Sequence, residues 1–183
     1  MKTTKKTIDK MEDTQAQTGK FSLNYGLLVG AVGIAFGIML YTMDMHYERG
    51  FAVQGTQTLI LVAGIVLGIY QFKKANSNFL TISEALKVGA GVALIAGLLG
   101  ILYFYIFSNF IEPDFMDNMY EIGKQQALID NPKLTEEQID QGIEMQKSFS
   151  WMTYPIILVM NILIGLVVGV ITGLILKKDK PAY

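Results

Sequence analysis

Residues 155–176 read PIILVMNILIGLVVGVITGLIL, a run of 22 residues that contains no charged side chain. Because an α-helix rises about 1.5 Å per residue, about 20 such residues cross the roughly 30 Å hydrocarbon core of a bilayer. Three more uncharged runs of similar length lie at 25–43, 52–72 and 88–107. The sequence therefore predicts an all-α polytopic membrane protein with four transmembrane helices, and it excludes a soluble globular protein.

The overall composition agrees with that class. Of the 183 residues, 51% are hydrophobic and only 17% are charged, whereas a soluble domain carries about 25% charged residues. The chain contains no cysteine. This excludes a disulfide framework, a thiolate metal site and a cysteine nucleophile.

The basic residues are divided unequally between the two sides of the predicted membrane domain. The N-terminal segment, the loop between the second and third spans and the C-terminal segment hold 11 of the 15 Lys and Arg residues, together with five of the 16 acids. Because Lys and Arg in short loops remain cytoplasmic, both termini are expected in the cytoplasm. The basic residues flank the spans and form no separate basic domain, so nucleic acid is not an expected partner.

These patterns divide the chain into three parts. Residues 1–20 are polar, which predicts a disordered cytoplasmic tail whose lysines lie against anionic lipid headgroups, with a regulatory tail as the alternative. Residues 21–178 form the transmembrane domain, and residues 179–183 form a second cytoplasmic tail. The first span follows a long polar segment and has full spanning length, so we expect an uncleaved start-transfer helix.

Glycines recur at helical spacing in all four spans. Small residues three or four positions apart form one stripe on a helix, and in lipid such stripes allow two helix backbones to approach closely. Two interpretations remain open: the stripes pack the four helices of one chain, or the first or fourth span binds another chain. The predicted helix-packing residues are Gly26, Gly30, Gly33, Gly37, Gly64, Gly68, Gly89, Gly97, Gly165, Gly169 and Gly173.

Residues 112–150 form the one sizeable segment between spans. Apolar residues recur at helical steps before and after the pair Asn131-Pro132, and that pair ends a helix. We therefore expect an extracytoplasmic two-helix hairpin. Its nine acids outnumber its three lysines, which favours a solvated acidic face, with divalent cations or a basic partner as alternatives.

Two helix starts carry a capping-box pattern, in which Thr is followed three residues later by Glu or Gln. Thr81 with Glu84 predicts the start of the helix that includes the third span. Thr135 with Gln138 predicts the start of the second hairpin helix.

No group of residues points to catalysis or to a cofactor. The middle of each span lacks ionisable side chains, which are costly in a bilayer and usually functional there, so transport by a single chain is not expected. The only histidine, His46, lies between Asp44 and Glu48. Positions two apart do not share a helix face, so we interpret them as a polar cluster at the outer interface rather than a metal site. We predict no catalytic, cofactor-binding or metal-binding residue.

Five short segments carry a resemblance to a known family. In chain order they are Asn24-Tyr25-Gly26, Phe72-Lys73-Lys74, Ser83-Glu84-Ala85-Leu86-Lys87, Phe110-Ile111-Glu112-Pro113-Asp114-Phe115 and Thr135-Glu136-Glu137. Together they resemble the domain-of-unknown-function 4199 family of small bacterial inner-membrane proteins, from about residue 20 to 178. The resemblance implies a four-span protein with an outer insertion. It implies no activity, because the family has no assigned biochemical function.

The expected function is that of a non-enzymatic interaction or accessory subunit in the bacterial inner membrane. The lipid bilayer surrounds it, and a second copy or another membrane protein would bind through the glycine-lined helices or the acidic hairpin. The alternative is a small channel or transporter component whose pathway forms between protomers. An enzyme with a metal site at His46 ranks third.

Overall fold

The computed structural model describes residues 16–48 and 50–179. In that part of the chain all regular elements are helical, apart from one isolated antiparallel bridge between Leu80 and Lys178. The four long helices are α2 (Thr18–Thr42), α3 (Phe51–Ala75), α4 (Ile82–Ile106) and α7 (Thr153–Leu176). Each is long and apolar enough to cross a membrane. The predicted all-α fold with four candidate membrane helices is confirmed.

The helices are longer than the uncharged runs that predicted them. Helix α2 begins at Thr18, seven residues before the run at 25–43 and inside the tail predicted for residues 1–20. The tail boundary was therefore placed too late. Backbone hydrogen bonding does not require apolar side chains, and Ser22 is buried against α4, which holds this polar first part of the helix in place. Residues 1–15 and 180–183 of the two predicted tails lie outside the described residues.

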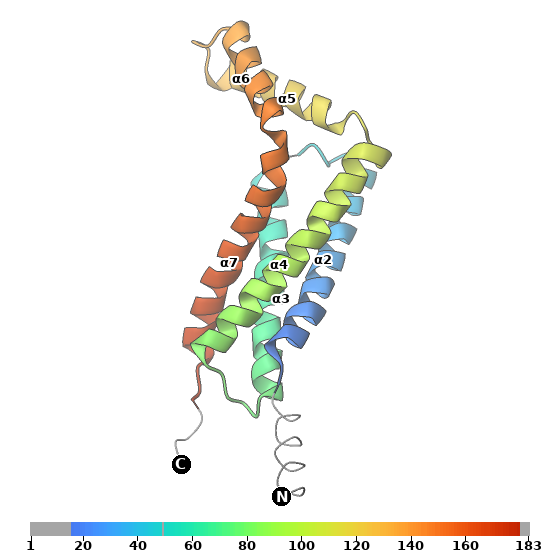
Figure 1. The fold of residues 1–183 in the computed structure, drawn as a ribbon. Helices are drawn as coiled ribbons and strands as arrows, with labels where there is room; N and C mark the ends of the chain where they lie inside the picture. Colours follow the sequence, from blue (N-terminus) through green and yellow to red (C-terminus); the bar gives the residue numbers. More distant parts are fainter. Residues whose placement is uncertain (1–15, 49, 180–183) are drawn as a thin grey trace, which may run out of the picture.

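The four long helices form a bundle in which α4 crosses the front, α3 lies behind it, and α2 and α7 lie on either side (Figure 1). The start of α2, the α3–α4 connection and the end of α7 lie at one end, which we call the proximal end. The α2–α3 connection and the helices that follow α4 lie at the opposite, distal end.

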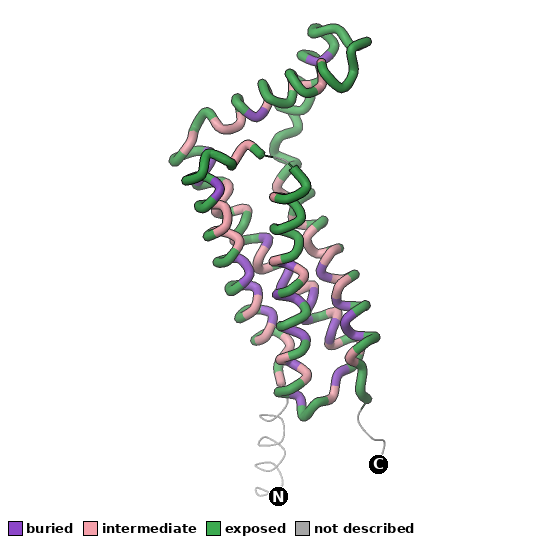
Figure 2. The backbone as a smooth tube through the Cα atoms, turned by 180° about the vertical axis from the view of Figure 1, so that it is seen from behind, coloured by how far each residue is buried: buried purple, intermediate pink, exposed green. Residues whose placement is uncertain are grey.

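The tightly packed core lies in the proximal half. Ile65, Ile69 and Phe72 of α3 and Val88 and Val92 of α4 have no exposed surface. Buried segments concentrate toward this end in Figure 2. The first turns of α3, at the distal end, are mostly exposed. The bundle is therefore closed at one end and loosely packed at the other.

Both predicted capping boxes are present. The amide of Glu84 donates to the Thr81 hydroxyl at 3.2 Å, and the amide of Thr81 donates to the Glu84 carboxylate at 2.8 Å. The same reciprocal pair joins Thr135 and Gln138, at 3.3 and 3.1 Å. Each pair satisfies two backbone donors that the first turn of a helix leaves unpaired.

Four shorter elements lie between α4 and α7. They are η1, a π-helix that continues α4 (Phe107–Ile111), α5 (Phe115–Asp130), α6 (Glu136–Ser148), and η2, a 3-10 turn that precedes α7 (Ser150–Met152). Helices α5 and α6 form a hairpin beyond the distal end of the bundle (Figure 1). Met119 and Ile139 are its buried apolar residues, and Lys124 bonds Asp140 across it at 2.6 Å.

Candidate functional site

The α4–α7 interface is a close approach of two backbones at glycine. A methyl group built on Gly89 would lie 2.5 Å from the carbonyl oxygen of Gly165. One built on Gly165 would lie 2.6 Å from the carbonyl oxygen of Gly89 and 2.6 Å from the Ala93 methyl. Any side chain at either position would therefore push the two helices apart.

Most of the predicted glycines face the backbone or a side chain of another helix of the same chain. The ten that do are Gly26, Gly30, Gly37, Gly64, Gly68, Gly89, Gly97, Gly165, Gly169 and Gly173. Gly33 differs, because no atom lies within 4 Å of a methyl group built on it. Gly91 was not among the predicted helix-packing residues, yet it meets the buried Ser22 of α2 just as closely. The small size of Gly91 and Ser22 was the feature of the sequence that could have predicted this contact.

A cleft occupies the distal half of the bundle, between the glycine-packed half and the open end. Its volume is about 410 Å³, and residues from all four long helices line it. Gly33 of α2 and Gly100 of α4 both border this cleft, and neither would bring a methyl group within 4 Å of another atom. Glycines on the same stripes thus serve two purposes: most allow helix contact, and these two leave space.

The cleft is polar at its rim and mostly apolar at its deep end, where Asn161 is a polar exception whose amide donates to the Ile157 carbonyl. Leu61, Ala96 and Ile164 line the deep part, next to the buried core. Gln57 and Tyr154 lie in the first turns of α3 and α7, toward the distal end. The amide of Gln57 and the hydroxyls of Tyr154 and Tyr103 have no hydrogen-bond partner among residues 16–48 and 50–179.

A second cavity of about 510 Å³ lies between the distal ends of α4 and α7 and the hairpin. Its wall includes Asp117 and Lys147, which form an ion pair at 3.0 Å. Phe104 and Tyr154 line both this cavity and the cleft, so the two spaces are neighbours.

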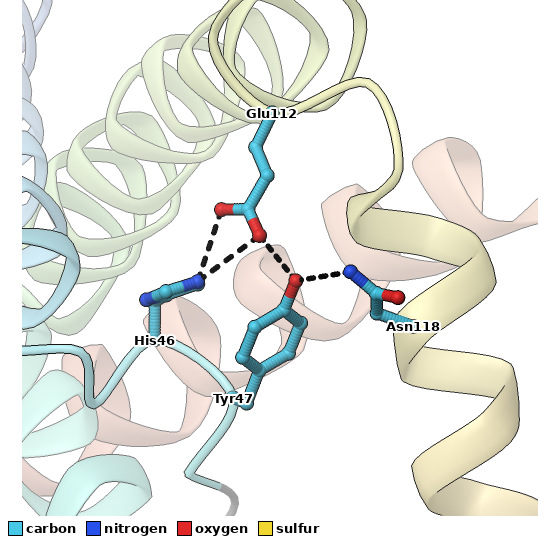
Figure 3. Close-up of polar contacts among 4 residues, drawn as sticks. All are labelled: His46, Tyr47, Glu112 and Asn118. Carbon is cyan, nitrogen blue, oxygen red and sulfur yellow. Dashed lines mark hydrogen bonds and ion pairs between the residues drawn. The ribbon is translucent and has the colours of Figure 1, made fainter.

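The distal end also holds a polar cluster that joins two connections (Figure 3). His46 lies between α2 and α3, and its Nε2 is 2.9 Å from Oε2 and 3.2 Å from Oε1 of Glu112, which follows η1. The Tyr47 hydroxyl donates to the same carboxylate, and the Asn118 amide donates to the Tyr47 oxygen at 2.8 Å. The side chains of His46 and Glu112 are only 12% and 19% exposed. The cluster fastens the α2–α3 connection to the base of the hairpin.

Aromatic rings enclose this cluster. The Tyr47 ring stacks on Phe115 at 5.4 Å between centroids, and the edges of Tyr41 and Phe107 face His46. Burial and the hydrogen bond to Glu112 raise the pKa of the Tyr47 hydroxyl. The phenol therefore remains a neutral donor over a wider pH range than an exposed tyrosine.

The cluster joins the α2–α3 connection to the start of the hairpin through the His46–Glu112 ion pair and the hydrogen bonds of Tyr47. His46 faces Glu112, while its sequence neighbours Asp44 and Glu48 are exposed. In the described part of the chain no three His, Asp or Glu side chains gather closely enough to hold a metal ion. His46 Nδ1 is buried without a hydrogen-bond partner in the described part of the chain. Sequence reasoning missed Glu112 as the partner of His46, because 66 positions separate them.

Comparison with known proteins identifies the family and nothing closer. No curated protein and no solved structure matches the chain. One family model, described as "Protein of unknown function (DUF4199)", matches residues 24–178. That range holds all four candidate spans nearly complete, together with the hairpin. The chain belongs to the DUF4199 family, as its sequence motifs predicted.

Proposed function

We propose that the protein is a non-enzymatic accessory subunit of the bacterial inner membrane, which binds a membrane-protein partner through its α5–α6 hairpin. The observation that carries the proposal is the tip of the hairpin. There Ile129 is 71% exposed and Leu134 is 43% exposed, on an element that lies beyond the bundle (Figure 1). Exposed apolar residues grouped on a projecting element mark an interaction surface. The acidic residues around them favour a basic partner surface.

Two features support a non-enzymatic role, and a third argues against transport through a single chain. The lining of the cleft contains no charged residue. The His46–Glu112 pair is enclosed by aromatic rings. The single-chain bundle is filled by apolar side chains in its proximal half, which argues against a polar path through one chain.

We place the proximal end in the cytoplasm and the hairpin outside. The proximal loops carry Lys73, Lys74, Lys177 and Lys178, as the positive-inside rule requires of cytoplasmic segments. A phosphatase reporter fused after Lys124 is expected to be active, and one fused after Lys74 silent. The opposite pattern would reverse the orientation.

The partner proposal is tested by purification from native membranes in mild detergent. The variant Ile129→Glu with Leu134→Glu places two charges on the apolar tip, and Gln141→Glu with Gln146→Glu adds the same charge at exposed polar positions of α6. A partner in fixed stoichiometry that the first variant loses and the second retains supports the proposal. If both variants keep the same partners, or only a homo-oligomer is recovered, the hairpin tip is not the binding surface. A homo-oligomer that conducts ions in liposomes would favour the pathway between protomers.

A further inference from the structure

We propose that the distal cleft binds one uncharged amphiphile, that is, a molecule with an apolar chain and a hydrogen-bonding head group that carries no ionic charge. This site is separate from the hairpin tip and does not depend on the accessory role proposed above.

The size and position of the cleft suit such a ligand. Its volume of about 410 Å³ falls within the range of about 300–1,000 Å³ that is usual for small-molecule sites. Sites in helical bundles are built from side chains of facing helices, and all four long helices contribute here. Because the cleft lies within the length of four membrane-spanning helices, molecules that partition into the bilayer can reach it.

The deep end of the cleft can hold the apolar chain of a ligand, but it does not continue as a pathway through the bundle. Val29 lines the cleft and packs against Gly64, in one cluster with the fully buried Ile65 and Val92. These side chains close the proximal half of the bundle. An apolar chain that enters from the distal side would therefore end at this core and would not pass through.

The rim supplies hydrogen bonds for a head group. The Gln57 amide and the hydroxyls of Tyr103 and Tyr154 come from three different helices, and within the described chain none of them has a hydrogen-bond partner. Gln57 is exposed and the two tyrosines are half-buried, so all three groups are accessible to a ligand that enters the cleft. A head group with hydroxyl or carbonyl oxygens would pair them.

The charge of the walls selects a neutral head group. No Asp, Glu, Lys, Arg or His lines the cleft, so an ionic group inside it would be desolvated without a counter-charge. In the neighbouring distal cavity, Lys147 is already paired with Asp117. Neither space therefore offers an unpaired charge to an ionic head group.

The glycines that leave the cleft open provide the test. A methyl group at Gly33 or Gly100 meets no atom within 4 Å, so Gly33→Leu and Gly100→Leu are expected to fill cleft space. Gly55→Leu is the matched control, because Gly55 also lies in a long helix with no atom within 4 Å but does not line the cleft. All three changes exchange the same residues, so their effects on helix propensity are equal.

The full-length protein, purified in mild detergent, is titrated with 1-monooleoylglycerol and with the anionic oleoyl-lysophosphatidate. Native mass spectrometry counts bound molecules, and the melting temperature reports stabilisation. Wild type and Gly55→Leu are expected to bind one monooleoylglycerol, with lysophosphatidate about tenfold weaker or more, and both cleft variants are expected to lose about tenfold or more in affinity. Gln57→Leu should reduce the preference for the neutral head group.

Two results would overturn the proposal. Equal binding of monooleoylglycerol by Gly33→Leu, Gly100→Leu and Gly55→Leu would place the lipid on the outer surface of the bundle. Equal affinity of the wild type for the neutral and anionic probes would show that the walls do not select an uncharged head group.

Discussion

The contrast between Gly165 and Gly33 gives the sharpest test of the packing. Gly165→Ala adds a methyl group 2.6 Å from both the Gly89 carbonyl oxygen and the Ala93 methyl, whereas Gly33→Ala adds one to open space. In a helix interior, Ala is favoured over Gly by about 0.5–1 kcal/mol. This gain is common to both variants and cancels in their difference. What remains is the overpacking cost at Gly165, about 1–3 kcal/mol.

The assay is reversible unfolding of both variants in the same detergent, with the melting temperature as a second measurement. Gly33→Ala is expected to be more stable than the wild type by about 0.5–1 kcal/mol. Gly165→Ala is expected to lie about 1–3 kcal/mol below Gly33→Ala. If the two variants are equally stable, the α4 and α7 backbones are not in contact at Gly165, and the reasoning on the glycine stripes is refuted.

Three more outcomes are expected. Glu112→Ala leaves His46 buried without its partner. This should lower the free energy of unfolding by about 1–3 kcal/mol and speed amide hydrogen exchange at residues 44–48. Unchanged exchange would argue that the cluster does not hold the α2–α3 connection. The pKa of Tyr47 is raised by burial and by Glu112. Its contribution to stability is therefore complete below the pKa of the unfolded chain and is lost as pH rises through the higher pKa of the folded protein. Tyr47→Phe should remove this loss of stability at alkaline pH, as measured by melting temperature against pH. Thr81→Ala removes a helix cap and should cost about 1 kcal/mol, while Thr81→Ser should restore most of it; equal melting of both would show that the cap contributes little.

Features that depend on a few adjacent residues were predictable from the sequence. Both capping boxes, at Thr81 and Thr135, formed as their spacing predicted, because each involves only residues three positions apart. Helix α5 ends at Asp130, directly before the pair Asn131-Pro132. The uncharged runs located all four long helices, because in lipid the backbone must bond to itself over the whole apolar length.

Features that depend on which helix lies opposite were not predictable. Gly30 and Gly33 are three residues apart on one stripe and look equivalent in the sequence. Both line the cleft, but a methyl group on Gly30 would meet Leu99, whereas one on Gly33 would meet no atom within 4 Å. The Glu112 partner of His46 likewise belongs to a distant connection. No local pattern distinguishes a glycine that another helix contacts from one that leaves open space, since the difference lies in how the helices cross.

The residue sizes along α4 explain why that crossing opens the cleft at one end. From Gly89 to Gly97 the helix is rich in Gly and Ala, and here α2 and α7 approach its backbone. From Tyr103 onward it carries large rings, which pack against Tyr41, Phe115 and Tyr154. The distance between helix axes depends on the side chains at the contact, and α7 lies close to α4 at the proximal end but away from it at the distal end (Figure 1). On the other side, Gly37 of α2 accommodates the Tyr103 ring, so α2 stays in contact with α4 at the distal end as well. The change from small residues to large rings along α4 therefore accounts for the separation of α4 from α7, and with it for the cleft that Gly33 and Gly100 border.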